Sequence, residues 1–173
     1  LRKLFQWLGT PDDIINKLAL DIIRLNEDVV NFKPMLELPT FKNVDLPPSA
    51  KIIDENTEDE NCKKVIAYMK SRCLHIDDTK FYWSPELGYR DRLIVPFFYN
   101  NNIVGWTARS VIPNKNPKYL SEQQPGFVYN LDEQGFNKSF VIVCEGPLDA
   151  IHIDGVALLG SEVKDQQALL INS

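Results

Sequence analysis

Two carboxylates, Glu145 and Asp149, directly follow the apolar, β-branched run 140–144 and enclose a turn that begins Gly146-Pro147. The run predicts a buried strand, the glycine permits a tight turn, and the proline suits the first position of a helix. Because α/β sheets place ligands where strands end, and helix N-termini favour anions, the pattern predicts a site for a metal ion and a phosphate. Glu145 would act as metal ligand or general base. Two roles stay open for Asp149: orienting metal-bound water or a basic partner, or complementing the helix dipole.

Charge is distributed unevenly along the chain, whose formal net charge is −5. Six basic residues stand against two acidic ones between positions 80 and 120, whereas the stretch beyond 120 carries eight acidic residues and two lysines. The basic residues are Lys80, Arg90, Arg92, Arg109, Lys115 and Lys118. A basic stretch followed by an acidic one would suit a surface that binds a polyanion with a phosphate backbone, next to a metal site. An uneven but ordinary solvated surface is the alternative.

Several classes of protein are disfavoured by composition. The three cysteines show no zinc-ligand spacing, so we expect reduced thiols rather than disulfides or a zinc site. The two histidines, His75 and His152, belong to no recognisable triad or ligand cluster. No apolar run approaches the roughly 20 residues that span a bilayer, and no secretory signal pattern is present. With 44% hydrophobic and 25% charged residues, the composition predicts a soluble, cytoplasmic protein without a membrane partner.

The N-terminal third predicts two helices joined by an extended connector. Residues 10–13, Thr-Pro-Asp-Asp, are typical of a helix start, and apolar residues then recur at helical spacing as far as Leu25. Four prolines in residues 31–50 predict the connector. A capping box from Thr57 to Glu60 opens the second helix. Its apolar face would consist of Cys62, Val65, Ile66, Met69 and Cys73.

The remainder predicts a hairpin and then alternating strands and helices. Residues 92–99 and 103–112 flank three asparagines that tolerate turn conformations, and Pro96 indicates an edge or a bulge. Strand 140–144, a helix, strand 156–159 and a helix over 162–171 capped by Ser161 predict a right-handed parallel βαβ unit.

Four collinear motifs carry a resemblance to a known family. Residues 140–151, Phe-Val-Ile-Val-Cys-Glu-Gly-Pro-Leu-Asp-Ala-Ile, resemble the first motif of the Toprim fold, a hydrophobic strand followed by E-G-x-x-D. Upstream, Arg92-Leu-Ile-Val-Pro-Phe, Gly105-Trp-Thr-Ala-Arg109 and Pro117-Lys-Tyr-Leu120 occur in the order and spacing of the primase catalytic core. Three features are similar to the small primase subunits of T-even-type tailed bacteriophages, which are related to the bacterial DnaG-type core. They are Tyr68-Met-Lys-Ser-Arg-Cys73, Phe81-Tyr-Trp83 and the Glu-Gly-Pro-Leu-Asp form of the Toprim motif.

The resemblance implies the fold and its division. We expect an α+β N-terminal lobe, made of helices and an antiparallel hairpin, followed by the first βαβα half of an α/β Toprim fold. Residues 1–56 would be a helical segment and linker following a zinc ribbon that is missing here. Residues 57–137 would be the DNA- and nucleotide-binding lobe, and residues 138–173 a partial Toprim domain.

The resemblance also implies the activity. A DNA primase is a DNA-directed RNA polymerase that joins nucleoside triphosphates on single-stranded DNA by metal-dependent nucleotidyl transfer, here in a phage primosome in the host cytoplasm. Glu145, with Asp149, would be catalytic and Glu145 would bind Mg²⁺ or Mn²⁺, while zinc would be confined to the missing ribbon. Arg92, Arg109 and Lys118 stand where the family has its basic residues, and Tyr119 could stack a base. Expected partners are single-stranded DNA, nucleoside triphosphates and a replicative helicase.

One departure from the family bears on activity. Toprim proteins carry a second acidic motif at the end of the next strand, and the sequence ends at Ser173 without one. We therefore expect this chain alone to fold but to be catalytically inactive. Two alternatives stay open: another Toprim enzyme, topoisomerase-like or a nuclease, and a non-catalytic module that binds single-stranded DNA or a helicase.

Overall fold

The computed structural model of the protein describes residues 11–18, 20, 21, 37–135 and 140–172. The chain divides into two compact units, Leu1–Glu37 and Leu38–Ser173. In the first unit, residues 12–18, 20 and 21 are helical, and the N–H groups of Ile14 and Ile15 donate to the Pro11 carbonyl at 3.1 Å each. The helix therefore begins where the sequence predicts. Ile15 is buried, whereas Ile14 and Leu18 are exposed. Thr10 and Leu25 lie outside the described residues.

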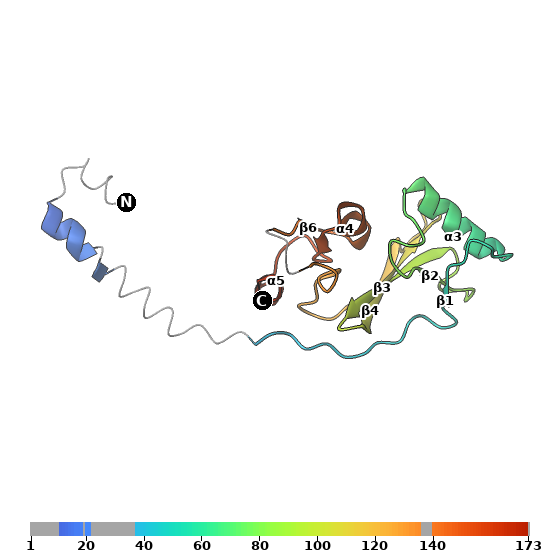
Figure 1. Cartoon of the computed structure of the whole chain (residues 1–173), viewed down its shortest axis with the longest axis horizontal. Helices are drawn as coiled ribbons and strands as arrows, with labels where there is room; N and C mark the ends of the chain where they lie inside the picture. The colour runs from blue at the N-terminus through green and yellow to red at the C-terminus, as the bar shows by residue number, and fades with distance from the viewer. Residues whose placement is uncertain (1–10, 19, 22–36, 136–139, 173) are drawn as a thin grey trace. The chain divides into compact units, whose positions relative to one another are not determined.

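A five-stranded antiparallel sheet forms the centre of the second unit (Figure 1). Its strands are paired in chain order: β1 (Lys51–Ile52), β2 (Tyr82–Trp83), β3 (Arg92–Tyr99), β4 (Asn102–Ser110) and β5 (Tyr119–Glu122). The predicted hairpin is confirmed as β3 and β4, with Asn100 and Asn101 both at positive φ in the turn. Pro96 has no N–H to donate to a neighbouring strand. It lies beyond Ile94, the one residue of β3 that pairs with β2, and just before a bulge at Phe97/Phe98, where a proline is tolerated.

Of the predicted connector over residues 31–50, the structure describes residues 37–50, which form no helix or strand but are not a free linker. From Leu38 onward it belongs to the second unit. The Val44 N–H donates to the Ile103 carbonyl at 2.8 Å, and the Phe41 ring lies edge-on to the rings of Tyr99 and Phe127 at centroid distances of 4.8 and 5.5 Å. Residues 38–50 are thus fastened to the sheet by a backbone hydrogen bond and an aromatic anchor.

Helix α3 (Glu60–Ser71) packs its predicted apolar face on the sheet. Cys62, Val65 and Met69 are buried as expected, and Ile66 is partly buried. Cys73, also predicted on this face, is instead exposed, because the helix ends at Ser71 before reaching it. The predicted capping box is wrong by two residues, because the N-cap is Asp59, whose carboxylate accepts from the N–H groups of Asn61 and Cys62 at 2.8 and 3.3 Å. Thr57 instead accepts from the Asp59 N–H at 3.2 Å, which holds the cap residue in place.

The C-terminal part has the predicted order of strands and helices: β6 (Val143–Cys144), α4 (Pro147–Ile153), β7 (Val156–Ala157) and α5 (Asp165–Ile171). Strands β6 and β7 are parallel, which confirms a βαβ unit. Gly155 is required between them, since a Cβ there would lie 2.5 Å from the Ile142 carbonyl oxygen. Helix α5 begins after Lys164, not after Ser161.

The expectation of a buried strand over residues 140–144 is wrong. Regular pairing covers only Val143 and Cys144, and Phe140, Ile142 and Val143 are 75%, 47% and 41% exposed. The physical reason is that β6 pairs only with β7, and no other described strand lies along its outer edge. An apolar run predicts burial only where a second layer or a neighbouring strand covers it.

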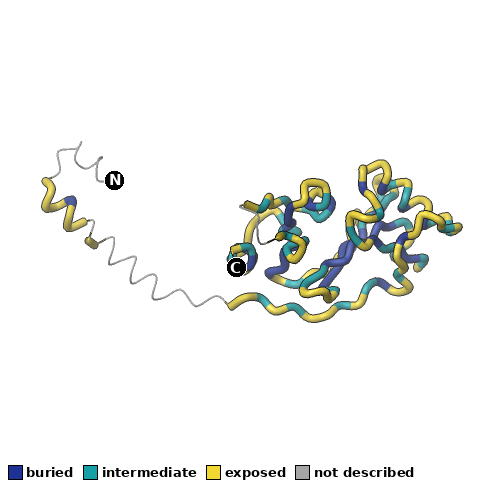
Figure 2. The backbone as a smooth tube through the Cα atoms, in the orientation of Figure 1, coloured by how far each residue is buried: buried dark blue, intermediate teal, exposed yellow. Residues whose placement is uncertain are grey.

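One hydrophobic core nevertheless joins the sheet to the βαβα part. Phe97 and Phe127, which stack at 5.4 Å, share this core with Leu148, Ala150 and Ala157. Figure 2 shows buried backbone, in dark blue, both in the sheet and in the C-terminal part. A second link is polar: His152 has Nδ1 2.6 Å from the Leu148 carbonyl oxygen and Nε2 2.7 Å from the Arg72 carbonyl oxygen at the end of α3. Among the described helices, none has the length and apolar character to cross a membrane.

Candidate functional site

The two predicted catalytic carboxylates lie at the end of β6 and in the first turn of α4. Glu145 follows the strand, its carbonyl accepts from the Leu159 N–H at 3.0 Å, and its side chain is exposed. Gly146 is the N-cap, and Asp149 folds back so that its Oδ2 would lie 3.4 Å from a Cβ at Gly146. The turn therefore brings the Asp149 carboxylate toward the residue next to Glu145. Their position agrees with the sequence pattern, while their catalytic role stays a prediction.

A metal ion would find an incomplete donor set here. Within the described residues, no group of three His, Cys, Asp or Glu side chains could hold a metal. Glu145 could serve as one oxygen ligand for Mg²⁺ or Mn²⁺, but these ions need more ligands than two nearby carboxylates provide. A metal bound at this strand end would therefore need further oxygen donors, from water, substrate phosphates or another carboxylate.

A basic cleft of about 760 Å³ lies between α3, the end of β4 and residues 111–118. Four cationic side chains line it: Lys64, Arg109, Lys115 and Lys118. Tyr68 and Ser71 supply part of the wall from α3. A concavity lined by one sign of charge concentrates counter-ions, so the cleft favours an anionic ligand.

Two of the four cations are already paired. The Asp91 carboxylate, whose side chain is 15% exposed, lies 3.4 Å from Lys64 Nζ and 3.8 Å from Lys115 Nζ. Lys115 also donates to the Arg90 carbonyl at 3.1 Å. By contrast, no carboxylate of the described chain forms a salt bridge with Arg109 or Lys118. These two predicted binding residues therefore carry the uncompensated positive charge of the cleft.

Arg109 is held by aromatic rings. Its guanidinium carbon lies 5.6 Å from the Tyr68 ring centroid and 5.1 Å from that of Tyr119, its cross-strand partner. One terminal nitrogen donates to the Tyr119 hydroxyl. Lys118 Nζ lies 5.6 Å from the same Tyr119 ring, which is 43% exposed. The predicted residues Arg109, Lys118 and Tyr119 are thus brought together, with cation–π contacts between them.

Arg92 occupies a different place from the one expected. It is only 2% exposed, and its guanidinium donates to the carbonyls of Ala108, Pro117 and Lys118 at 3.2, 2.9 and 3.4 Å. Burial lowers the pKa of Arg92 because the charged form loses hydration. Instead of facing a ligand, the side chain joins β4 to the backbone that carries Lys118.

Tyr68 is the functional candidate for which sequence reasoning assigned no role. It belongs to the segment 68–73 that resembles the phage primase subunits. Its position next to Met69 on α3 predicts only that it lies beside the apolar face of the helix. Its contact with Arg109 depends on how α3 packs on the sheet, which local sequence does not encode. Burial raises the pKa of Tyr68, and the nearby charge of Arg109 partly opposes that rise.

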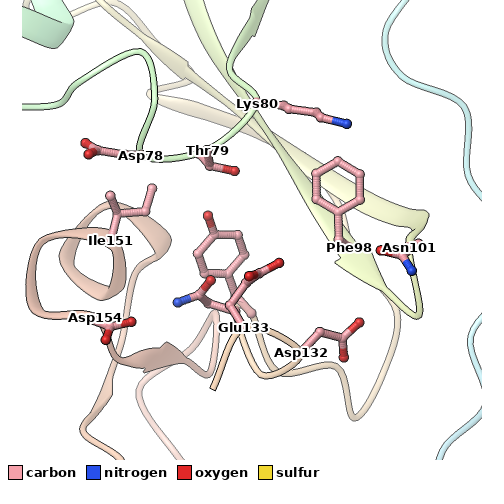
Figure 3. A pocket seen from close by; sticks show the side chains of 11 residues that line it. Asp78, Thr79, Lys80, Phe98, Asn101, Asp132, Glu133, Ile151 and Asp154 are labelled. Atoms are coloured by element: carbon pink, nitrogen blue, oxygen red, sulfur yellow. The ribbon is translucent and has the colours of Figure 1, made fainter. Parts of the chain in front are cut away.

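A second cavity, of about 540 Å³, has the opposite character (Figure 3). Asp78, Asp132, Glu133 and Asp154 surround it, with Lys80 near the Phe98 ring at 6.0 Å from the centroid. Tyr129 also lines it and is only 4% exposed. Burial raises the pKa of Tyr129 well above its ordinary value, and the nearby charges of Glu133 and Asp78 add to the rise.

This shift predicts alkaline sensitivity. A tyrosine with a raised folded-state pKa contributes stability that is complete below the unfolded pKa, about 10, and is lost above it, because only the unfolded chain ionises there. We expect the free energy of unfolding to fall by about 1.4 kcal/mol per pH unit above pH 10 from this one group. Urea unfolding at pH 9 and pH 11 should show a smaller loss in Tyr129→Phe than in the unmodified chain. Equal losses in both would contradict the assignment.

Comparison with known proteins gives the fold. No protein-family model and no curated protein matches the chain. A solved structure of a DnaG primase catalytic domain bound to single-stranded DNA matches with a TM-score of 0.54 and 16% identity, over 66% of this chain and 54% of that one. The DnaG catalytic core matches at 0.55 and 17%, and the E. coli primase catalytic core at 0.54 and 15%; each match covers 66% of this chain and 53% of the other. The chain thus spans about half the length of these structures, and over 66% of its own residues it has the fold of DnaG-type primase catalytic cores.

Proposed function

We propose that this protein is part of a DNA primase, a template-directed nucleotidyltransferase that makes short RNA primers on single-stranded DNA, of the T-even-type phage kind that the sequence resembles. The observation that carries the proposal is the basic cleft, where Arg109 and Lys118 lack carboxylate partners among the described residues. Template backbone and nucleoside triphosphates are both polyanions, and such a cleft would suit them. That one similar structure is a primase domain bound to single-stranded DNA supports the same ligand here.

The residues would divide the work as follows. Arg109 would bind phosphate with its planar fork, Lys118 would add a mobile point charge, and Tyr119 would stack a base on its exposed ring. Arg92 would act indirectly, by holding the backbone of Lys118. Glu145 and Asp149 would contribute carboxylates to a metal site in the Toprim part, where Mg²⁺ or Mn²⁺ would neutralise the oxygens that gain charge during nucleotidyl transfer. A replicative helicase remains the expected protein partner.

Single-strand binding tests the assignment of the cleft. We expect Arg109→Ala to weaken binding of a dT oligonucleotide about tenfold and Lys118→Ala about threefold, because each substitution removes a cation that would bind phosphate. The slope of log K against log salt should become shallower by about 0.7 for each phosphate that is no longer neutralised. Fluorescence anisotropy at several salt concentrations measures both quantities.

The matched control is Lys70→Ala. Lys70 also lies on α3 but is exposed, pairs with Glu55 at 3.5 Å and does not line the cleft. The substitution should change neither the affinity for the oligonucleotide nor the slope of log K against log salt by more than twofold. Unchanged slopes for both Arg109→Ala and Lys118→Ala would exclude the cleft as the binding track.

A further inference from the structure

Two buried polar groups in the wall of the basic cleft lack hydrogen-bond partners. They are the Tyr68 hydroxyl and Arg109 Nε; Arg92 Nε, which also has no partner among the described residues, does not line the cleft. Both residues line the cleft, and the Arg109 guanidinium lies against the Tyr68 ring. A buried polar group without a partner is costly and rare in folded proteins, so two in one cluster indicate that something absent from the free protein completes them.

The missing group must be a hydrogen-bond acceptor. Arg109 Nε–H can only donate. The Tyr68 hydroxyl faces the Arg109 guanidinium, which can only donate to it, so the hydroxyl's own proton has no acceptor among the described residues. Lys118, which lines the same cleft without a salt bridge to any described carboxylate, adds a third donor. A tetrahedral phosphate group has enough oxygens to accept from all three and carries the charge that the cleft favours.

We propose that Tyr68 and Arg109 together form a receptor for one phosphate group, in which the Tyr68 hydroxyl binds the phosphate directly and its ring holds the guanidinium in the binding orientation. The identity of the molecule that carries the phosphate rests on the proposed function: a nucleoside triphosphate or the backbone of single-stranded DNA. The two tyrosine rings fix Arg109 before the ligand arrives, so less side-chain entropy is lost on binding.

The test compares Tyr68→Phe with the unmodified chain. The substitution removes one oxygen, keeps the ring against Arg109 and changes no charge. Tyr82→Phe is the matched control, because Tyr82 is a partly buried tyrosine on β2 that does not line the cleft. Isothermal titration with pyrophosphate, ATP and a dT oligonucleotide gives the affinities, and differential scanning fluorimetry without ligand gives the melting temperatures.

We expect Tyr68→Phe to weaken pyrophosphate binding about tenfold, which is the usual effect of losing a hydrogen bond to a charged group. The melting temperature of the free variant should rise by about 2–4 °C, since a buried unpaired hydroxyl is gone. Tyr82→Phe should leave the affinity unchanged. A merely structural role for the Tyr68 hydroxyl predicts the opposite sign in melting temperature, so lower affinity together with a lower melting temperature would overturn the proposal.

The three ligands separate the possible results. If Tyr68→Phe weakens the binding of pyrophosphate and of only one of the other two ligands, ATP or the oligonucleotide, that result supports the receptor. It also identifies the affected ligand as the source of its phosphate. Tyr68-dependent pyrophosphate binding without ATP or oligonucleotide binding supports the receptor but contradicts the proposed function. Binding of both ATP and the oligonucleotide that is equal in Tyr68→Phe and the unmodified chain leaves the proposed function standing and overturns the receptor. Absence of pyrophosphate binding by the unmodified chain overturns it as well.

Discussion

Replacing Glu145 with alanine in the proposed primase is expected to lower template-directed RNA synthesis about 10³-fold, because the proposed metal site would lose a carboxylate worth several kcal/mol in the transition state. Binding of single-stranded DNA should stay within twofold, because the basic cleft does not include Glu145. Incorporation of labelled nucleotides on a single-stranded template, with Mg²⁺ and again with Mn²⁺, measures the first quantity. Anisotropy of a labelled oligonucleotide measures the second.

Glu58→Ala is the control for loss of one negative charge, because the Glu58 side chain is 97% exposed and makes only a surface ion pair with Lys63. It should retain full synthesis. Undiminished synthesis by Glu145→Ala would contradict the catalytic assignment. An unmodified enzyme that binds DNA but makes no RNA under any metal condition would instead favour the non-catalytic binding module.

Replacing Arg92 with alanine is expected to destabilise the folded chain by about 3 kcal/mol. The guanidinium is buried and makes three hydrogen bonds to carbonyls on both sides of the β4–β5 connection, so its removal leaves a cavity and unpaired acceptors. Arg92→Lys should still cost about 2 kcal/mol, because a point charge cannot replace the planar fork. Equilibrium urea unfolding measures both values.

Binding data for Arg92→Ala, which removes the charge that Arg92→Lys keeps, then decide between an indirect and a direct role. Where the variant is folded, an indirect role predicts weaker oligonucleotide binding, through a less well placed Lys118, with an unchanged salt dependence. A clear decrease in salt dependence would show that Arg92 contacts phosphate, as the sequence alone suggested. Arg90→Ala is the control, since Arg90 is exposed and its side chain makes none of these hydrogen bonds.

Local sequence predicted the features that depend on local physics. The asparagine turn between β3 and β4, the burial of Cys62, Val65 and Met69 on α3 and the turn at Gly146-Pro147 all follow from backbone preferences or periodicity, and the structure confirms them. The exact cap of α3 did not follow, because Thr57 and Asp59 can both accept from a helix N-terminus and only their backbone geometry decides between them.

The features that sequence missed depend on tertiary neighbours. Arg92 has the sequence appearance of a surface arginine on a strand, yet the carbonyls that surround it come from segments 16 and 25–26 residues away. Tyr68 reaches Arg109 only because of the way α3 packs in the folded chain. The strand before Glu145 looks buried in sequence and is largely exposed in the fold, since a run of apolar residues does not specify what will cover it.

The hydrogen-bonded ring of His152 ties the basic cleft to the turn that carries the two carboxylates. Its Nε2 lies 2.7 Å from the carbonyl oxygen of Arg72, one turn beyond Tyr68 on α3, and its Nδ1 lies 2.6 Å from the carbonyl oxygen of Leu148 in the first turn of α4. Helix α4 begins directly after Glu145 and Gly146. A displacement of the end of α3 relative to α4 would therefore lengthen or break the contact between His152 Nε2 and the Arg72 carbonyl oxygen. The wall of the cleft and the turn of the two carboxylates are thus connected through a single side chain.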